Sequence, residues 1–118
     1  MKDCMALVVE DEESVRHLLE LLVRRHCSEV HVASDGEEAM RMLRERSYAL
    51  VVLDLMLPRM NGLAVSEAIA ALASPPKVIV LSALSRYFAD RFPPDTVVLQ
   101  KPFDIDRIED ALTAFGFP

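Results

Sequence analysis

Short apolar runs alternate along this chain with segments in which apolar residues recur every three or four positions. The first pattern is typical of β-strands and the second of one buried face of an α-helix. The run at 29–33 differs, because its polar and apolar residues alternate as they do in an edge strand. The expected strands are residues 6–9, 29–33, 49–53, 78–81 and 97–99.

Helix-like spacing follows four of these runs. Ser14 and Asp104 stand where N-cap residues of the first and last helix are expected. Between residues 84 and 95 a helix should also form, but Pro93 and Pro94 shorten it, so a short or irregular fourth helix is predicted. The faces expected to be buried are Val15, Leu18, Leu19, Leu22 and Val23; Gly36, Ala39, Met40 and Leu43; Ala64, Val65, Ala68, Ile69 and Leu72; and Ile105, Ile108, Leu112 and Phe115.

Strands that alternate with helices predict an α/β fold. Short right-handed crossovers make neighbouring strands parallel and place helices on both faces of the sheet. The chain has 118 residues, contains no repeat or linker-like tract, and is long enough for one core. A single domain over residues 1–118 is therefore expected.

Composition and charge narrow the class of protein. An apolar fraction of 52% with 27% charged residues is typical of globular domains, and the net charge of −6 disfavours nucleic-acid binding by this domain. No apolar stretch is long enough to cross a bilayer and the start does not resemble a signal peptide, so a cytoplasmic location is expected. Cys4 and Cys27 lack metal-type spacing and are expected to be reduced, structural thiols.

Polar residues of different kinds follow four of the apolar runs. They are Glu10 with Asp11, then Asp54, Ser82 and Lys101. Because parallel strands end at one edge of a sheet, these side chains should surround one crevice, which is where open α/β sheets bind ligands. Clustered carboxylates raise one another's pKa unless a cation compensates, and Mg2+ suits such a set of oxygens.

Four segments together resemble the bacterial response-regulator receiver domains. They read MALVVEDEES (5–14), VVLDLMLPRMNG (51–62), KVIVLSA (77–83) and QKPF (100–103), in the family's order and at nearly its spacing. The resemblance covers essentially the whole chain. It implies a flavodoxin-like, doubly wound parallel sheet of five strands in the order 2-1-3-4-5.

The resemblance also implies roles for the acidic residues. Asp54 would be the phosphoacceptor, whose carboxylate attacks phosphorus and forms an aspartyl phosphate. Asp11 and Asp54 would coordinate Mg2+ directly together with the backbone carbonyl of Met56, and Glu10 would act through a bound water. A solvated strand end and a charged helix start are the plainer interpretations of these residues.

Two further residues would bind the phosphoryl oxygens by the same resemblance. They are Ser82 and Lys101, and the Lys101–Pro102 peptide bond would be cis. Each alone is more often a turn residue or a surface charge.

Signal output is where the chain departs from the family. Receivers commonly carry an aromatic residue three positions before the lysine, but this chain has Val98 there. Tyr87 or Phe88 is instead hypothesised to report the state of the pocket and to help form a partner or dimer surface; packing in a dense core is the alternative.

The predicted function is that of a receiver domain in a two-component phosphorelay. It would accept a phosphoryl group on Asp54 from a histidine kinase or phosphotransfer protein, in a Mg2+-dependent reaction, and signal to a downstream protein, with a homodimer on activation as a further expectation. No direct contact with nucleic acid or membrane, and no enzymatic activity beyond its own phosphorylation and dephosphorylation, is expected.

Three alternatives stay open. A degenerate receiver would act only as an interaction module. A haloacid-dehalogenase-like phosphotransferase would need an acidic residue where Met56 stands, and a flavodoxin-like cofactor binder would need a phosphate loop in place of the acidic residues 10–13.

Overall fold

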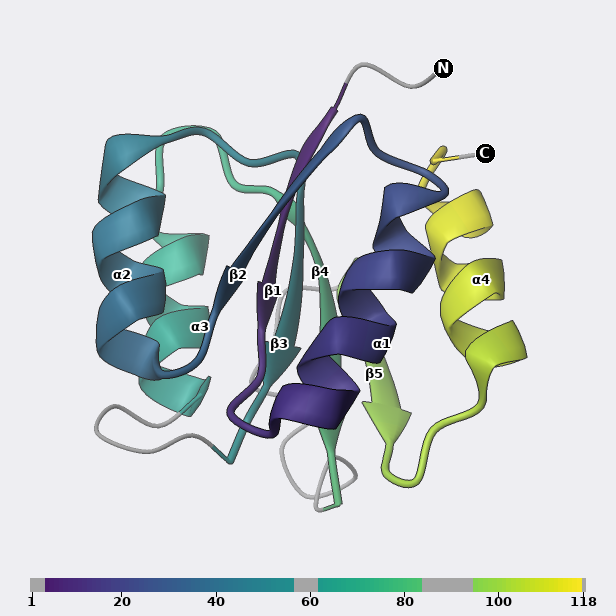
Figure 1. Cartoon of the computed structure of the whole chain (residues 1–118). Helices are drawn as coiled ribbons and strands as arrows, with labels where there is room; N and C mark the ends of the chain where they lie inside the picture. Colours follow the sequence, from purple (N-terminus) through teal and green to yellow (C-terminus); the bar gives the residue numbers. More distant parts are fainter. Residues whose placement is uncertain (1–3, 57–61, 84–94, 118) are drawn as a thin grey trace.

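The computed structural model describes residues 4–56, 62–83 and 95–117. Their strands form one parallel sheet in the order β2-β1-β3-β4-β5, which confirms the predicted α/β topology (Figure 1). The edge position of β2 is also as predicted. The strands are β1 Met5–Val9, β2 Glu29–Ala33, β3 Leu50–Asp54, β4 Lys77–Ser82 and β5 Val97–Gln100.

Helices cover both faces of this sheet. α1 and α4 lie on one face, and α2 and α3 lie on the other (Figure 1). No described helix is long and apolar enough to span a membrane. The helices are α1 Glu13–Arg24, α2 Gly36–Glu45, α3 Gly62–Ala70 and α4 Ile105–Ala114. The segment in which a short fourth helix was expected, 84–94, lies outside the described residues.

The central strands supply two cores at once. Successive strand residues point to opposite faces, so a run without polar interruption serves both sides of the sheet. In β1, Ala6 and Val8 pack in the cluster beneath α1 and α4, whereas Leu7 and Val9 pack in the cluster beneath α2 and α3. All five residues of β3 are buried, which explains why that run shows no alternation.

Two residues of the predicted helix faces are exposed instead. Leu18 of α1 has an exposed fraction of 39%, and Ile105 of α4 one of 44%. One predicted cap position is wrong and the other is right. α1 begins after Glu12, so Ser14 lies inside the helix, whereas Asp104 is the N-cap residue of α4. Neither Glu12 nor Asp104 forms a side-chain cap hydrogen bond.

Among the helices whose N-cap residue is described, α2 has a side-chain cap. The Asp35 carboxylate accepts a hydrogen bond from the Glu38 amide at 2.8 Å. In return, the Glu38 carboxylate accepts from the Ser34 amide at 2.8 Å, an arrangement related to the capping box. These bonds fix the turn between β2 and α2.

The expectation of reduced thiols is wrong. Cys4 and Cys27 are joined by a disulfide, with Cα atoms 4.9 Å apart, within the range that a disulfide can bridge. Parallel pairing of β1 with β2 brings them together, because the Glu29 amide donates to the Cys4 carbonyl at 3.1 Å. The separation of the two cysteines by 23 residues does not by itself predict that they are in contact.

Substitutions at the N-cap positions of α2 and α4 should lower the free energy of unfolding by different amounts. Asp35→Ala should lower the free energy of unfolding by about 1 kcal/mol, because a helix amide loses its partner. Asp104→Ala should cost less than half as much, since that carboxylate caps nothing. Urea denaturation followed by circular dichroism measures both, with Asp35→Asn as a control that retains the acceptor. Equal losses at the two positions would contradict this account.

Candidate metal centre

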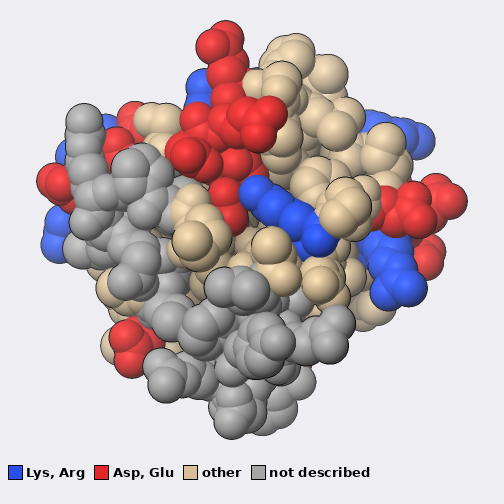
Figure 2. Space-filling model, turned by 90° about the horizontal axis from the view of Figure 1, so that it is seen from below, with Lys and Arg blue, Asp and Glu red and all other residues tan. Residues whose placement is uncertain are grey.

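The sheet brings the predicted polar residues to one edge. Val9 is the register partner of Leu53, and Asp54 is that of Leu81, so β1, β3 and β4 end side by side. Glu10 directly follows β1. Figure 2, which views this edge from below, shows a compact patch of acidic side chains with a basic side chain against it.

Three carboxylates form the centre of the patch. One oxygen from each of Glu10, Asp11 and Asp54 lies within 4.8 Å of the others. Glu10 and Asp54 are almost fully buried, with exposed fractions of 1% and 2%, whereas Asp11 is exposed. The cluster is thus open to solvent on one side and built into the core on the other.

Backbone amides orient the two buried carboxylates. The Glu12 amide donates to Glu10 Oε2 at 3.2 Å, and the Met56 amide donates to Asp54 Oδ1 at 3.1 Å. Each carboxylate is held by the turn that immediately follows its own strand. The orientation of each carboxylate is therefore set by the turn after its strand as well as by the sheet.

Lys101 pairs with both buried carboxylates of the site. Its Nζ lies 3.1 Å from Asp54 Oδ2 and 3.3 Å from Glu10 Oε1, so one ammonium bridges both buried carboxylates. The Lys101 amide donates to the Ser82 carbonyl at 3.1 Å, which ties the end of β5 to β4. The Lys101–Pro102 peptide bond is cis.

These contacts shift two pKa values. Burial raises the pKa of Glu10 from 4.5 to about 7, with the charge of Asp54 adding to the rise and the Glu12 amide and Lys101 opposing it. Burial acts against the charge of Lys101, but its bonds and attraction to Asp54 and Glu10 outweigh that cost, so its pKa lies above the usual value. Without a bound cation, the folded protein therefore disfavours the ionised form of Glu10.

Arg16 is a member of the site that the sequence analysis missed. From the first half of α1, its Nη1 donates to the carbonyl oxygens of Glu10 at 3.1 Å and Asp11 at 3.4 Å. The guanidinium thus supports the backbone from which both carboxylates project. A positively charged side chain near the N-terminus of a helix interacts unfavourably with the helix dipole. The position of Arg16 near the start of the first predicted helix was therefore the feature of the sequence that could have indicated its role.

The remaining predicted residues have different positions. Ser82 is buried at the end of β4, beside the strand end that carries Asp54, whereas the Met56 side chain is 64% exposed. Val98 is half-buried in β5 and packs against the cluster beneath α2 and α3. Tyr87 and Phe88 lie outside the described residues.

The donor set fits a small divalent cation. Three ionised carboxylates beside one ammonium leave two negative charges, and all the ligands are hard oxygens, as Mg2+ requires. Burial is the main cause of the raised pKa of Glu10, the charge of Asp54 adds to it, and Lys101 offsets only part of the rise. Chemically, the site combines a cation-binding acidic pair, a buried carboxylate and a fixed ammonium.

Solved structures with the same fold include two close matches. The N-terminal domain of a protein from Wolinella succinogenes is 30% identical, with a TM-score of 0.83 over 96% of this chain and 93% of that one. The receiver domain of a sensor histidine kinase from Pseudomonas aeruginosa PAO1 is 22% identical, with a TM-score of 0.81 over 97% and 98% of the two chains. That structure is described with a magnesium ion coordinated in the active site cleft.

A curated relative and a family model also match the chain. The transcriptional regulatory protein SrrA of Staphylococcus aureus (strain NCTC 8325 / PS 47) is 40% identical over 77 residues, which is 65% of this chain and 32% of that protein. The chain therefore matches about a third of that relative's length. The family model of the response regulator receiver domain matches residues 6–113. The chain belongs to the response regulator receiver domain family.

Proposed function

We propose that this chain is a phosphorylation-dependent switch whose acceptor is Asp54. A histidine kinase or phosphotransfer protein supplies the phosphoryl group, and the reaction depends on Mg2+. The observation that carries the proposal is the bridging of Asp54 and Glu10 by Lys101, with Asp11 completing the acidic cluster. The family to which the chain belongs supports the same assignment.

The chemistry requires a nucleophile held in place. A carboxylate oxygen of Asp54 attacks phosphorus, the bond from phosphorus to the donor's imidazole nitrogen breaks, and that nitrogen leaves with the electron pair. The Met56 amide and Lys101 fix one oxygen of Asp54 each. Orientation of the nucleophile is therefore built into the resting protein.

Three groups would stabilise the transferred phosphoryl group. Lys101 loses a carboxylate partner when Asp54 becomes an acyl phosphate, so its ammonium follows the negative charge onto the phosphoryl oxygens, and the Ser82 hydroxyl would donate from the neighbouring strand. Mg2+, held by Asp11, Asp54 and the Met56 carbonyl with Glu10 acting through water, would supply the remaining positive charge.

Signalling would follow from this transfer of charge. Rearrangement around Ser82 and Lys101 would change the surface that a downstream protein or a second copy of the chain contacts. Residues 1–118 would act as one receiver unit in the cytoplasm, where ATP-dependent kinases operate. The domain would be a regulated phosphoacceptor, with no other substrate and no direct contact with nucleic acid.

Labelling with a small phosphodonor tests the proposal. The parent chain should gain one acid-stable, base-labile phosphoryl group with Mg2+ present, and Asp54→Asn should reduce the label by at least about a hundredfold because the nucleophile is lost. Asp35→Asn is the matched control, since it alters another buried carboxylate outside the cluster. Intact-protein mass spectrometry measures the label. Full labelling of Asp54→Asn, or none of the parent, would refute the proposal.

Glu10→Gln should have opposite effects on stability and on metal binding. The folded pKa of about 7 exceeds the reference value of 4.5, so the folded state binds more protons between these values and stability falls as pH rises through them. Above about pH 7 the metal-free variant should therefore be more stable by about 1–3 kcal/mol, and this gain should vanish below about pH 4.5. Mg2+ should bind about tenfold more weakly.

Two measurements check this pair of effects. Urea denaturation at several pH values, without divalent cations, gives the stability difference, and titration calorimetry gives the Mg2+ affinity. Glu12→Gln is the control, because Glu12 lies outside the three-carboxylate cluster. A variant that is less stable above neutral pH, or that binds Mg2+ as well as the parent does, would contradict the role given to Glu10.

A further inference from the structure

The end of the sheet opposite the carboxylates carries a second group of connected side chains. We name it the α1–β2 corner and define it as residues 25–28, the segment between α1 and β2. α4 also ends beside this corner (Figure 1). The corner therefore lies where two helices of one face finish.

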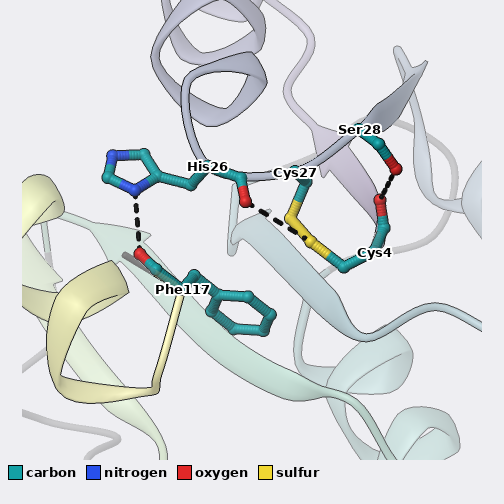
Figure 3. The surroundings of a disulfide bond; sticks show 5 residues. All are labelled: Cys4, His26, Cys27, Ser28 and Phe117. Carbon is teal, nitrogen blue, oxygen red and sulfur yellow. Dashed lines mark hydrogen bonds between the residues drawn. A yellow bond between two sulfur atoms is a disulfide. The ribbon is translucent and has the colours of Figure 1, made fainter. Parts of the chain in front are cut away.

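A disulfide holds the corner to the start of the sheet. Cys27 is joined to Cys4, which directly precedes β1, and the Ser28 hydroxyl donates to the Cys4 carbonyl at 3.0 Å (Figure 3). Cys27 is buried in the core cluster, whereas Cys4 is half-buried. The chain contains two cysteines, so this pair has no third thiol with which to exchange.

The end of α4 presents an acceptor to the same corner. The Phe117 amide donates to the Leu112 carbonyl at 2.8 Å, and the Gly116 amide donates to the Thr113 carbonyl at 3.0 Å. Gly116 has φ +94°, so these bonds form a Schellman motif. The Phe117 carbonyl then lies 2.8 Å from Nδ1 of His26 (Figure 3).

Glu109 of α4 makes the second connection. Its carboxylate contacts Nε2 of His26 and forms an ion pair with Nη1 of Arg25 at 3.0 Å. His26 is buried, and both of its ring nitrogens face acceptor oxygens. Three successive residues, Arg25, His26 and Cys27, thus join α1 to α4 and to β1.

Both oxidation states of the cysteine pair fit these surroundings. Cys4 Sγ lies 3.5 Å from the His26 carbonyl oxygen, so a thiol at Cys4 would have an acceptor for its hydrogen (Figure 3). Cys27 would remain among apolar side chains, where a thiol behaves as a small hydrophobic group. Reduction of the disulfide would therefore leave neither cysteine with a buried polar atom that lacks a hydrogen-bond partner.

We propose that Cys4 and Cys27 form a reversible thiol–disulfide site that controls how firmly the end of α4 is held. A thiolate of an external dithiol attacks Cys4 Sγ, the Cys4–Cys27 bond breaks, and Cys27 leaves as a thiolate that takes up a proton. The second thiol of the reductant then displaces Cys4. In total, the protein gains two electrons and two protons, and the dithiol becomes a disulfide.

The connection to α4 runs through the residue next to Cys27. With the disulfide closed, Cys27 fixes the corner against β1, and His26 is held where it meets Phe117 and Glu109. With the disulfide open, the corner loses its covalent attachment and His26 fluctuates with it. Where thiols are kept reduced, disulfides are mostly transient or redox-sensing, which favours a switch over a permanent crosslink in the proposed cytoplasmic domain.

Two measurements on the intact, unphosphorylated chain without Mg2+ test this. Mass-tagging of free thiols across glutathione and dithiothreitol buffers should show a single two-electron transition, with two tags added together. Hydrogen exchange should then show that the Gly116 and Phe117 amides exchange about tenfold faster after reduction. Neither readout depends on phosphorylation, so their failure is separable from that of the proposed function.

Variants locate the effect. Cys4→Ser with Cys27→Ala should exchange fast at these two amides whatever the reductant. His26→Ala should do so even when oxidised, because its link to Phe117 is missing. A pair that stays closed in excess dithiothreitol under native conditions, a pair that never closes in oxidised glutathione, or unchanged exchange at Gly116 and Phe117 would each overturn the proposal.

Discussion

The ammonium of Lys101 lies between two buried carboxylates, and the chemistry of the site follows from this arrangement. Asp54 and Glu10 are almost fully buried and are 3.1 and 3.3 Å from its nitrogen. Burying one carboxylate without a partner is strongly unfavourable, and burying two is worse. Burial raises the pKa of Glu10 despite the opposing charge of Lys101, so one ammonium offsets only part of this cost. A centre that lacks positive charge is suited to binding a cation.

The fold brings the residues of this centre together. Parallel strands place residues 91 positions apart in the sequence at one sheet edge, and turn amides orient the carboxylates that arrive there. α1 and α4 both start beside the centre and both finish at the corner held by the Cys4–Cys27 disulfide. The same pair of helices therefore connects the two ends of the sheet.

The sequence predicted most of this arrangement because the buried layers leave strong patterns. The all-apolar β3 and β4 runs, the alternating β2 and the polar residue after each run reflect burial directly. The exposure of Leu18 and Ile105 could not be predicted from the sequence. Helical spacing shows which residues share one face of a helix, but not how much of that face the sheet covers. The bonds of Arg16 depend on a side chain that turns back toward the strand end. The disulfide depends on β1–β2 register, which Cys spacing does not encode.

The role of Lys101 can be seen in a structure of the chain with Mg2+ and beryllium trifluoride, which mimics a phosphoryl group. Beryllium should be bonded to an Asp54 oxygen, Lys101 Nζ should contact a fluorine, and Asp11 and Asp54 should bind the ion. Beryllium on a different carboxylate, or Lys101 still bridging Asp54 and Glu10 with the mimic bound elsewhere, would contradict this prediction.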